Sequence, residues 1–567
     1  MPEYDLVIRS GVIVDGNGGA PATGDIAVSD GIIREVGRVA GSGRQEIAAD
    51  GAVVAPGFVD IHTHYDAQAT WDQRLAPSSW HGVTTVVMGN CGVGFAPVSP
   101  QDHERLVELM EGVEDIPGVV MTEGLSWDWA SFPDYLDALG RRRYDIDVAA
   151  QVPHAALRVH AMGARASAHA VATEDDIAAM ATLVKQAVAA GAIGFSTSRS
   201  LNHKSVSGEL TPSYDASVRE LTEIARAMGT TGKGVLQLVT DYPDVDADID
   251  LMRRMTTASG RPLSVTLTHK NTEPDRYLRI LDAISAANRD GLVIRGQVPV
   301  RGIGLLLGLH CTLNPFVANP VYQEVAALPV ASRSARMADP ELRSRILAAQ
   351  TAAMGADVVG GALIQQWHLM YQLTDPPNYE PPADQSIAAV AARTGRSPAD
   401  VAYDWLLEDN GNAMIYLPGS GYPGSLDIVR ELLVHEHTVP ALSDGGAHVG
   451  TICDASFPTT LLQHWVRDRS HDRLDLAFAV SRQARDTATA VGLTDRGRLV
   501  PGLRADINVI DLPALRVHRP EMIHDLPAGG KRLMQRADGY RHTFVAGVET
   551  YRDGEPTGAL PGRLVRT

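Results

Sequence analysis

Strand-like and helix-like segments alternate through the middle of the chain, and this alternation constrains the fold more than any other feature. Short apolar runs are separated by longer segments with the residue spacing of helices. The clearest stretch consists of Ala192–Ser196, Ala216–Met228, Gly234–Leu238, Asp246–Ala258 and Pro262–Leu267. Strands separated by helices at this spacing form βαβ units with a parallel sheet, and about eight such units close into a barrel. The sequence therefore predicts an α/β fold of the TIM-like (β/α)8 barrel type.

Both ends of the chain have a different texture, with short strand-like runs separated by glycines. Examples are the runs at residues 4–9 and 31–36 near the start and at residues 506–511 and 542–548 near the end. Such runs indicate antiparallel strands with tight turns. We expect residues 1–55 and 491–567 to form together one small discontinuous β-sandwich domain, beside a barrel of residues 56–490.

A long segment at about residues 301–412 interrupts the barrel pattern and contains the proline-rich stretch 375–382. Long excursions from a barrel are commonly binding loops or lids, and packing inserts are nearly as common. We predict an insertion here and leave both roles open.

Composition and charge narrow the classes of function. The chain has 567 residues with 50 basic and 68 acidic side chains, which give a formal net charge of −18. This charge argues against nucleic acid or an anionic membrane as a partner. Three cysteines are too few for a disulfide framework and fit a reducing compartment. Because the first residues lack signal-peptide features and no 18-residue apolar run occurs, we expect a cytoplasmic location.

The strongest local signal is an apolar run that ends in two histidines two residues apart, His62 and His64. Residues i and i+2 of a strand share a face, so both imidazoles point the same way at the carboxyl end of the strand. In a barrel this is the end that carries the active site. The pattern predicts that one metal ion binds both side chains; a surface pair of histidines is the alternative.

Several segments together resemble the amidohydrolase superfamily, and within it the N-acyl-D-amino-acid deacylase (D-aminoacylase) family. The segments lie along nearly the whole chain: Gly57–His64, Gly82–Gly92 with its Asn-Cys-Gly turn, Ala190–Ser198, Thr268–Lys270, Leu442–Gly445 and Gly497–Ile507. The resemblance implies that Cys91 is a zinc ligand, whereas a small buried residue is the alternative reading. It also implies that His269 is a metal ligand, with a hydrogen-bonding role beside the metal equally open.

Asp444 is the residue that we expect to be catalytic. In the superfamily the aspartate at this position binds the metal and accepts the proton of the attacking water. The family's fifth strand normally ends in a ligand histidine, but the corresponding strand here contains Gln237. Glutamine is a poor ligand for zinc, which favours nitrogen and sulfur donors. We therefore expect one Zn2+ ion on His62, His64 and Asp444, with two ions as the alternative.

Six further residues are candidates for binding the substrate. Three follow the fourth barrel strand, one replaces the ligand histidine of the fifth strand, one follows the third strand and one follows Asp444: Arg199, His203, Lys204, Gln237, His154 and His448. The loop of the first three offers cationic groups for an anion, and an exposed loop without that role is the alternative. The family's carboxylate-binding arginine has no counterpart in residues 445–458.

The resemblance implies a zinc-dependent hydrolase that cleaves the amide bond of an N-acyl amino acid, expected to be the D form, or of a similar N-acylated small molecule. An amidohydrolase acting on another C–N bond, such as a cyclic amide, a carbamate or an N-acyl aromatic metabolite, is the alternative enzyme. From another class, a metal-poor barrel could serve as a scaffold. The expected partner is a small N-acylated substrate, and a homo-oligomer stays open.

Overall fold

The computed structural model describes residues 2–350 and 363–567, and its centre is an eight-stranded parallel sheet. Its strands, in chain order, are β6 (Phe58–Asp60), β7 (Val83–Met88), β8 (Asp147–Pro153), β9 (Gly194–Arg199), β10 (Val235–Thr240), β11 (Leu263–Thr266), β12 (Ile294–Val298) and β16 (Thr438–Pro440). Neighbours in sequence are neighbours in the sheet, as βαβ units require. Almost every residue of these strands is buried, which explains their continuous apolar runs.

The two edges of the sheet meet, so that the strands form a closed barrel. Thr63, just after β6, and Gly445, just after β16, form a parallel bridge. The His64 N–H donates to the Gly445 carbonyl oxygen at 2.8 Å, and the Asp444 N–H donates to the His62 carbonyl oxygen at 3.1 Å. The closure of the barrel therefore places the segment of the two histidines directly beside the segment of Asp444.

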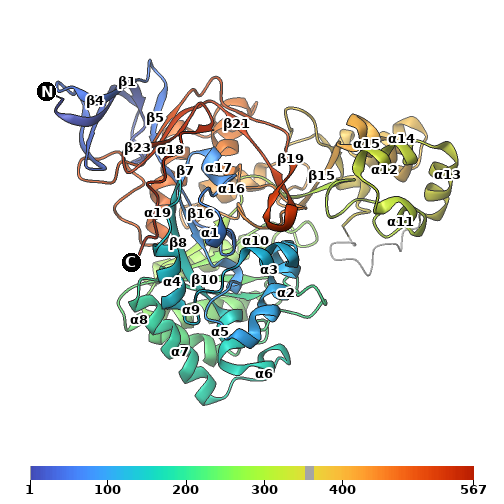
Figure 1. Cartoon of the computed structure of the whole chain (residues 1–567), viewed down its shortest axis with the longest axis horizontal. Helices are drawn as coiled ribbons and strands as arrows, with labels where there is room; N and C mark the ends of the chain where they lie inside the picture. The colour runs from blue at the N-terminus through green and yellow to red at the C-terminus, as the bar shows by residue number, and fades with distance from the viewer. Residues whose placement is uncertain (1, 351–362) are drawn as a thin grey trace.

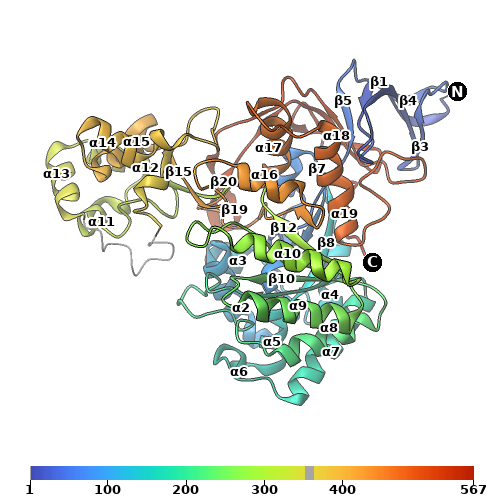
Figure 2. The same cartoon turned by 180° about the vertical axis from the view of Figure 1, so that it is seen from behind.

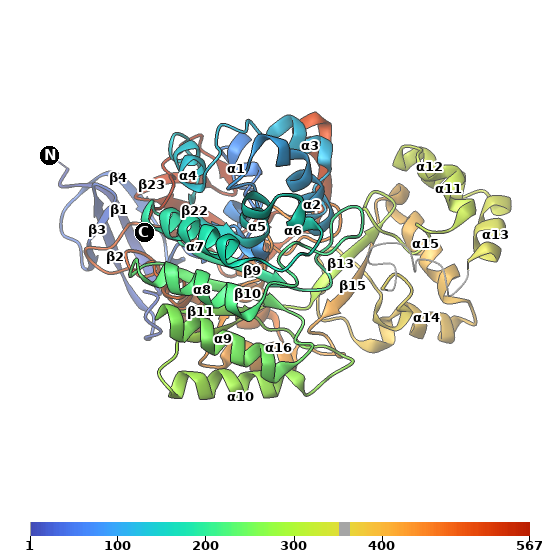
Figure 3. The same ribbon diagram turned by 90° about the horizontal axis from the view of Figure 1, so that it is seen from below.

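Helices cover the outside of the barrel. Four of them, α7 (Glu174–Ala189), α8 (Val218–Gly229), α9 (Val245–Ser259) and α10 (Arg276–Arg289), lie side by side in Figure 3. Side-chain oxygens cap the amino ends of several of them; the Thr173 hydroxyl accepts from the Asp176 N–H at the start of α7, and Asp244 accepts from two N–H groups at the start of α9. The remaining barrel-side helices include α2 (His103–Glu114), α4 (Phe132–Gly140), α5 (His154–Met162) and α16 (Asp427–Val434).

Strands from both ends of the chain form one nine-stranded sheet, at the upper left of Figure 1. The strands are β1 (Tyr4–Ile13), β2 (Ala22–Ser29), β3 (Ile32–Gly37), β4 (Gly43–Ala48), β5 (Val53–Pro56), β17 (Ile507–Ile510), β22 (Tyr540–Val545), β23 (Val548–Arg552) and β24 (Glu555–Pro556). Strand β17 pairs with β5, which joins the last part of the chain to the first. The predicted fold class, a (β/α)8 barrel with a β domain from both termini, is confirmed.

Buried ion pairs join the returning chain to the amino-terminal end of the barrel. The carboxylate of Asp147, the first residue of β8, accepts hydrogen bonds from Arg496 at 2.8 Å and from Arg504 at 3.0 Å. All three side chains are at most 14% exposed. Separating the barrel from the β domain would leave these buried charges unpaired, which is costly where water is excluded. The cluster therefore couples the two parts.

The segment between β12 and β16 forms a separate unit that projects from the barrel, on the right in Figure 1 and on the left in Figure 2. Its sheet consists of β13 (Ile303–Gly308), β15 (Met414–Ser420) and β14 (Tyr371–Gln372). Its helices are α11 (Pro320–Ala326), α12 (Val330–Met337), α13 (Pro340–Ala349), α14 (Ile387–Thr394) and α15 (Pro398–Gly411). The unit has its own apolar core, which includes Phe316, Tyr322, Met337 and Tyr403.

The C-terminal part of the chain also contributes a hairpin that does not belong to the nine-stranded sheet. It consists of β19 (Glu521–Leu526) and β20 (Gly530–Met534), which pair only with each other. The main-chain N–H of Leu533 donates to the Val449 carbonyl oxygen at 2.7 Å, so the hairpin lies against the loop that follows Asp444. Within the described residues, no helix has both the length and the apolar character to cross a membrane.

Glu380, in the proline-rich stretch, anchors the projecting unit to the barrel. Its carboxylate accepts two hydrogen bonds from Arg469, at 3.0 and 3.1 Å, and one from the Leu426 N–H at 2.8 Å. Burial alone would raise the pKa of Glu380, but the bonds from His464 and Arg469 outweigh it and lower the pKa to about 2, from an ordinary 4.5. The carboxylate thus contributes stability that is complete above pH 4.5 and disappears as the pH falls towards 2.

We predict that Glu380→Gln lowers the stability of the protein at pH 7 by about 2 kcal/mol, because the hydrogen bonds that the buried Arg469 donates lose their charged acceptor. Thermal unfolding of the variant and the wild type, followed between pH 7 and pH 3.5, measures the difference. The gap in Tm is expected to narrow below pH 4.5. Asp384→Asn, an exposed position four residues after Glu380, is the control; an equal loss in both variants would contradict the anchoring role.

Candidate metal centre

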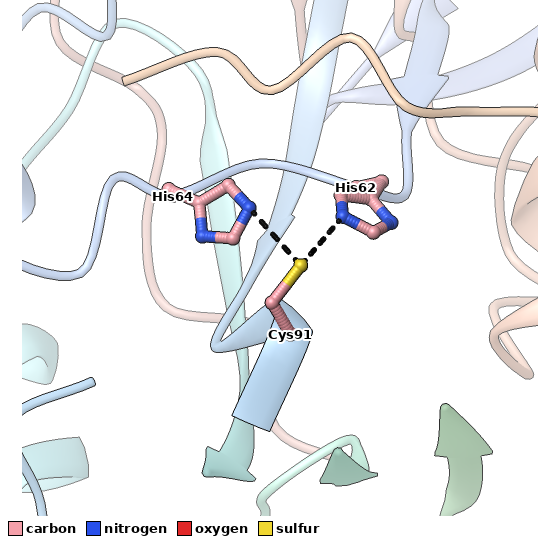
Figure 4. A group of neighbouring side chains, drawn as sticks. All are labelled: His62, His64 and Cys91. Carbon is pink, nitrogen blue, oxygen red and sulfur yellow. Dashed lines mark hydrogen bonds between the residues drawn. The ribbon is translucent and has the colours of Figure 1, made fainter. Parts of the chain in front are cut away.

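His62 and His64 follow β6 directly and are each 1% exposed. Their Nε2 atoms converge on one sulfur atom, that of Cys91, at 3.3 Å from His62 and 3.7 Å from His64. Figure 4 shows the His62 and His64 rings both pointing towards this sulfur. Two imidazole nitrogens and a thiol sulfur within 4.8 Å of one another form a group that could hold a metal ion.

Cys91 lies in the turn Asn90–Gly92, which follows β7, and adopts a left-handed backbone with φ 57°. The two flanking glycines are required by space as well as by backbone conformation. A Cβ at Gly89 would lie 2.3 Å from the Gln151 carbonyl oxygen, and one at Gly92 would lie 3.0 Å from the Thr197 Cα. The turn is therefore pressed against the neighbouring strands β8 and β9, and this contact directs the thiol towards the two histidines.

Asp444 brings a carboxylate to the same point from the other edge of the barrel sheet. Its Oδ1 lies 3.4 Å from His62 Nε2 and 3.7 Å from His64 Nε2. Burial would raise the pKa of Asp444, but the bond from His64 and the nearby imidazoles outweigh it and lower the pKa well below its usual range. Asp444 is accordingly an ionised carboxylate at neutral pH.

The protonation of His62 fits a metal ion, and deprotonation of Cys91 requires one. Burial lowers the pKa of His62 to about 4, so this imidazole is neutral at pH 7, as a ligand must be. Burial raises the pKa of the Cys91 thiol to about 12. Such a thiol is deprotonated at neutral pH only when a cation such as zinc binds the sulfur and displaces the proton. The donor set therefore suits a cation that prefers nitrogen and sulfur.

A hydrogen bond to the other ring nitrogen orients His62. Its Nδ1–H donates to the Gln297 Oε1 at 2.6 Å, and the Gln297 Nε2 donates to the Ser264 hydroxyl at 2.9 Å. Because Nδ1 carries the proton, the lone pair of Nε2 faces Cys91 and Asp444. Such outer partners raise ligand basicity and fix ring orientation. Sequence reasoning missed Gln297, because a glutamine within a barrel strand has no spacing signal.

Glu114, the last residue of α2, is a second residue that sequence reasoning missed. Its carboxylate is 1% exposed, and its oxygens lie 3.2 Å from His64 Nδ1 and 3.6 Å from His448 Nε2. Burial by itself would lower the pKa of His64, but Glu114 and Cys91 outweigh it and raise this pKa well above its ordinary value. A Glu-Asp pair at a helix end resembles a pair of surface charges in a sequence, so no pattern distinguished Glu114.

Two predicted substrate-binding residues lie beside the centre. His448 Nε2 is 4.0 Å from Asp444 Oδ2, and its side chain is 25% exposed. The ring of His203 bonds through Nδ1 to the Ser198 hydroxyl at 2.7 Å. Burial and the neighbouring imidazoles His448 and His64 lower the pKa of His203 to about 4. The loop after β9 thus contributes a neutral histidine, rather than a cation, next to the centre.

Gln237 lies under the cysteine turn. Its Oε1 accepts from the Cys91 N–H at 3.2 Å, while its Nε2 has no hydrogen-bond partner within the described part of the chain. His269 is buried, and neither of its ring nitrogens has a partner among the described residues. It lies outside the group formed by His62, His64 and Cys91. The structure thus groups Cys91 with the two histidines, and His269 is not a member of that group.

Two of the other three candidates, Arg199 and His154, have side-chain partners elsewhere. The guanidinium of Arg199 lies 3.5 Å from Asp248, on α9. Lys204 forms a main-chain bridge with Leu210 within its own loop. His154 is fully buried at the start of α5, where its ring nitrogens bond to Thr197 at 2.8 Å and to Glu220 at 2.9 Å. His154 therefore has no ring nitrogen free for a substrate, and its contacts are those of a core residue.

We predict that Glu114→Gln weakens metal binding by about 10- to 100-fold, the usual cost of removing the partner of a ligand histidine. Competition with a chromogenic chelator measures the affinity. Glu108→Gln, an exposed position on the same helix, is the control and should leave the affinity within twofold. Equal affinity of the two variants would show that Glu114 does not orient His64.

Comparison with known proteins confirms the resemblance. The N-acyl-D-glutamate deacylase of Alcaligenes xylosoxydans xylosoxydans is 25% identical over 100% of this chain and 97% of its own. A D-aminoacylase studied for its binuclear metal centre has the same fold, with a TM-score of 0.65 at 23% identity over the whole of both chains. The N-acyl-D-glutamate deacylase of Bordetella bronchiseptica, solved with zinc and a phosphonate inhibitor, gives the same TM-score, identity and coverage.

A family model described as the amidohydrolase family matches residues 45–556, which is most of the chain and includes the metal centre. The protein belongs to the amidohydrolase family.

Proposed function

We propose that the protein is a zinc-dependent amidohydrolase that hydrolyses the amide bond of an N-acyl amino acid, with the D form as the first candidate. The observation that carries the proposal is the convergence of His62, His64 and Cys91 next to the ionised carboxylate of Asp444. The relatives that are named as deacylases of N-acyl-D-amino acids support the choice of substrate.

His62, His64 and Cys91 would hold the zinc ion, and Asp444 Oδ1 lies close enough to join them. When bound, zinc makes water more acidic and polarises a carbonyl oxygen, so hydrolysis proceeds near neutral pH. The residues around it exclude bulk water, because the ligand side chains of His62, His64 and Cys91 are all buried. A dry site strengthens each charge interaction in it.

Asp444 is the proposed general base and general acid. As an ionised carboxylate it accepts the proton of the attacking water on one oxygen, and it then delivers that proton to the nitrogen of the leaving amine. Its Oδ2 faces His448 at 4.0 Å, on the side away from His62. His448 and His203 are the proposed donors to polar groups of the substrate. His448 lies 4.0 Å from the Asp444 carboxylate, the charges of His448 and His64 contribute to the low pKa of His203, and both side chains are partly exposed.

We predict that Asp444→Asn lowers kcat by about 10³-fold, within the range of about 10²- to 10⁴-fold that general acid–base catalysis contributes. The asparagine has the same shape, so the fold should be retained. Steady-state rates on N-acetyl-D-amino acids, with circular dichroism of both proteins, test this. Near-normal turnover by the variant would overturn the assigned role.

The number of metal ions follows from Gln237. A second ion would need a ligand in place of this amide, whose oxygen is already occupied by the Cys91 N–H. We predict about one zinc per chain in freshly purified protein, measured by elemental analysis, and loss of that ion in Cys91→Ala. Chelation should abolish amide hydrolysis, and added zinc should restore it. Two tightly bound ions would contradict the single-metal centre.

One sequence feature favours an alternative substrate. The stretch after Asp444, residues 445–458, contains no arginine to bind an amino acid carboxylate. A cyclic amide, a carbamate or an N-acyl aromatic compound lacks that carboxylate and would not need the arginine. A mixed panel of N-acyl-D-amino acids, N-acyl-L-amino acids and these neutral amides separates the two candidates, because each predicts turnover of a different part of the panel.

A further inference from the structure

A small cavity lies next to Asp444, and the C-terminal hairpin forms one of its walls. Its volume is about 30 Å³, and its apolar lining includes Trp71, Ile116, Val449, Leu526 and Leu533. The first two come from the barrel loops after β6 and β7, Val449 follows Asp444, and the two leucines come from β19 and β20. A segment more than 70 residues beyond the catalytic aspartate in sequence therefore borders the same space.

Direct bonds hold the hairpin in this place. The Leu533 N–H donates to the Val449 carbonyl oxygen at 2.7 Å, and the Cys453 thiol donates to the Leu533 carbonyl oxygen at 3.7 Å. At the hairpin turn, Gly530 lies so close to Val120 of α3 (Gly118–Gly124) that a Cβ there would be 2.3 Å from the valine side chain. The hairpin also contacts the projecting unit, because Leu533 packs in one apolar cluster with Leu306 and Met414 and Lys531 donates to the His310 carbonyl oxygen at 2.6 Å.

The cavity does not suit an anionic group, because its one arginine is already paired and its other charged side chains are carboxylates. Arg532 binds Asp525 through two hydrogen bonds of 2.8 Å and donates to Gln68 at 3.1 Å. The buried Asp454 forms an ion pair with Arg301 at 2.7 Å through Oδ1, while its Oδ2 has no hydrogen-bond partner within the described part of the chain. Apart from the carboxylates of Asp444 and Asp454, the side chains that the cavity offers a substrate are mainly apolar.

We propose that this cavity receives an apolar substituent of the substrate next to the scissile amide, and that Leu533 sets the size of that substituent. The inference rests on the proposed function and adds the substrate class to it. The substituent could be the acyl chain, which is attached to the carbonyl carbon of the amide, or the side chain of the amino acid, which is attached to the carbon next to the amide nitrogen. A cavity of about 30 Å³ holds roughly two water molecules, so a short substituent fits better than a long one.

The experiment uses two substrate series with the full-length protein. In the first series the acyl chain of an N-acyl-D-alanine is acetyl, butyryl or hexanoyl. In the second, N-acetyl is kept and the D side chain is that of alanine, norvaline or norleucine. For each series, the kcat/KM of the longest member divided by that of the shortest measures the tolerance for size.

We expect Leu533→Ala to raise this ratio about tenfold in one of the two series, since each buried methylene is worth roughly a fourfold change in affinity. The series that responds identifies the substituent in the cavity. Leu533→Phe should shift the same ratio in the opposite direction, and it provides a second measurement if the alanine variant is unstable. Met534→Ala is the matched control, because Met534 is the next residue of β20, is equally buried at 4% and does not line the cavity.

The outcomes are distinct. Turnover by all variants with both ratios within twofold of the wild type overturns this inference and leaves the proposed function in place. An equal shift in Leu533→Ala and Met534→Ala also overturns it, because the effect would then come from loosening the hairpin. Absence of turnover of every N-acyl-amino acid by the metal-loaded wild type overturns the proposed function, and this inference with it.

Discussion

The hydrogen bonds that close the barrel are the constraint on which the metal centre depends. A parallel sheet has two edges, and its last strand must meet its first for the barrel to close. Here the meeting point is the bridge between Thr63 and Gly445, one residue from His62 and His64 on one side and from Asp444 on the other. The main-chain bonds between these segments, at 2.8 and 3.1 Å, fix the carboxylate next to the imidazoles before any ion binds. The same main-chain bonds therefore close the barrel and assemble the site.

Carboxylates around the buried donors stabilise the site that closure of the barrel assembles. Two histidines and a thiol at this depth are costly without opposite charge, and the chain supplies two carboxylates, Asp444 on the inner side and Glu114 on the outer side of His64. Glu114 is itself buried, so it is stable there because of the imidazoles that it faces. The N–H of His448 donates to the Glu114 carbonyl oxygen. This bond couples the end of α2 to the loop after Asp444, so both carboxylates are positioned by the same pair of segments.

The sequence predicted the parts of the fold that arise from local pattern. Alternating apolar segments indicated the barrel, and the spacing of His62 and His64 indicated that their rings share a direction. Residues that act through long-range packing left no such pattern. Glu114 and Gln297 come from elements distant in sequence, and the position of the hairpin at the cavity depends on contacts with Val449 and Val120. His154 illustrates the opposite case: it follows a barrel strand, as a site residue would, but Thr197 and Glu220 use both of its nitrogens.

The residue type at position 237 affects which donor atoms are present at the centre. A histidine at this position could share a second ion with Cys91, whereas the amide oxygen of glutamine accepts the Cys91 N–H and presents no nitrogen lone pair. The bond holds the left-handed cysteine turn in place, and the sulfur remains directed at His62 and His64, at 3.3 and 3.7 Å. This arrangement supports the proposal that the cysteine binds the same ion as the two histidines, because the three donor atoms lie within 4.8 Å of one another.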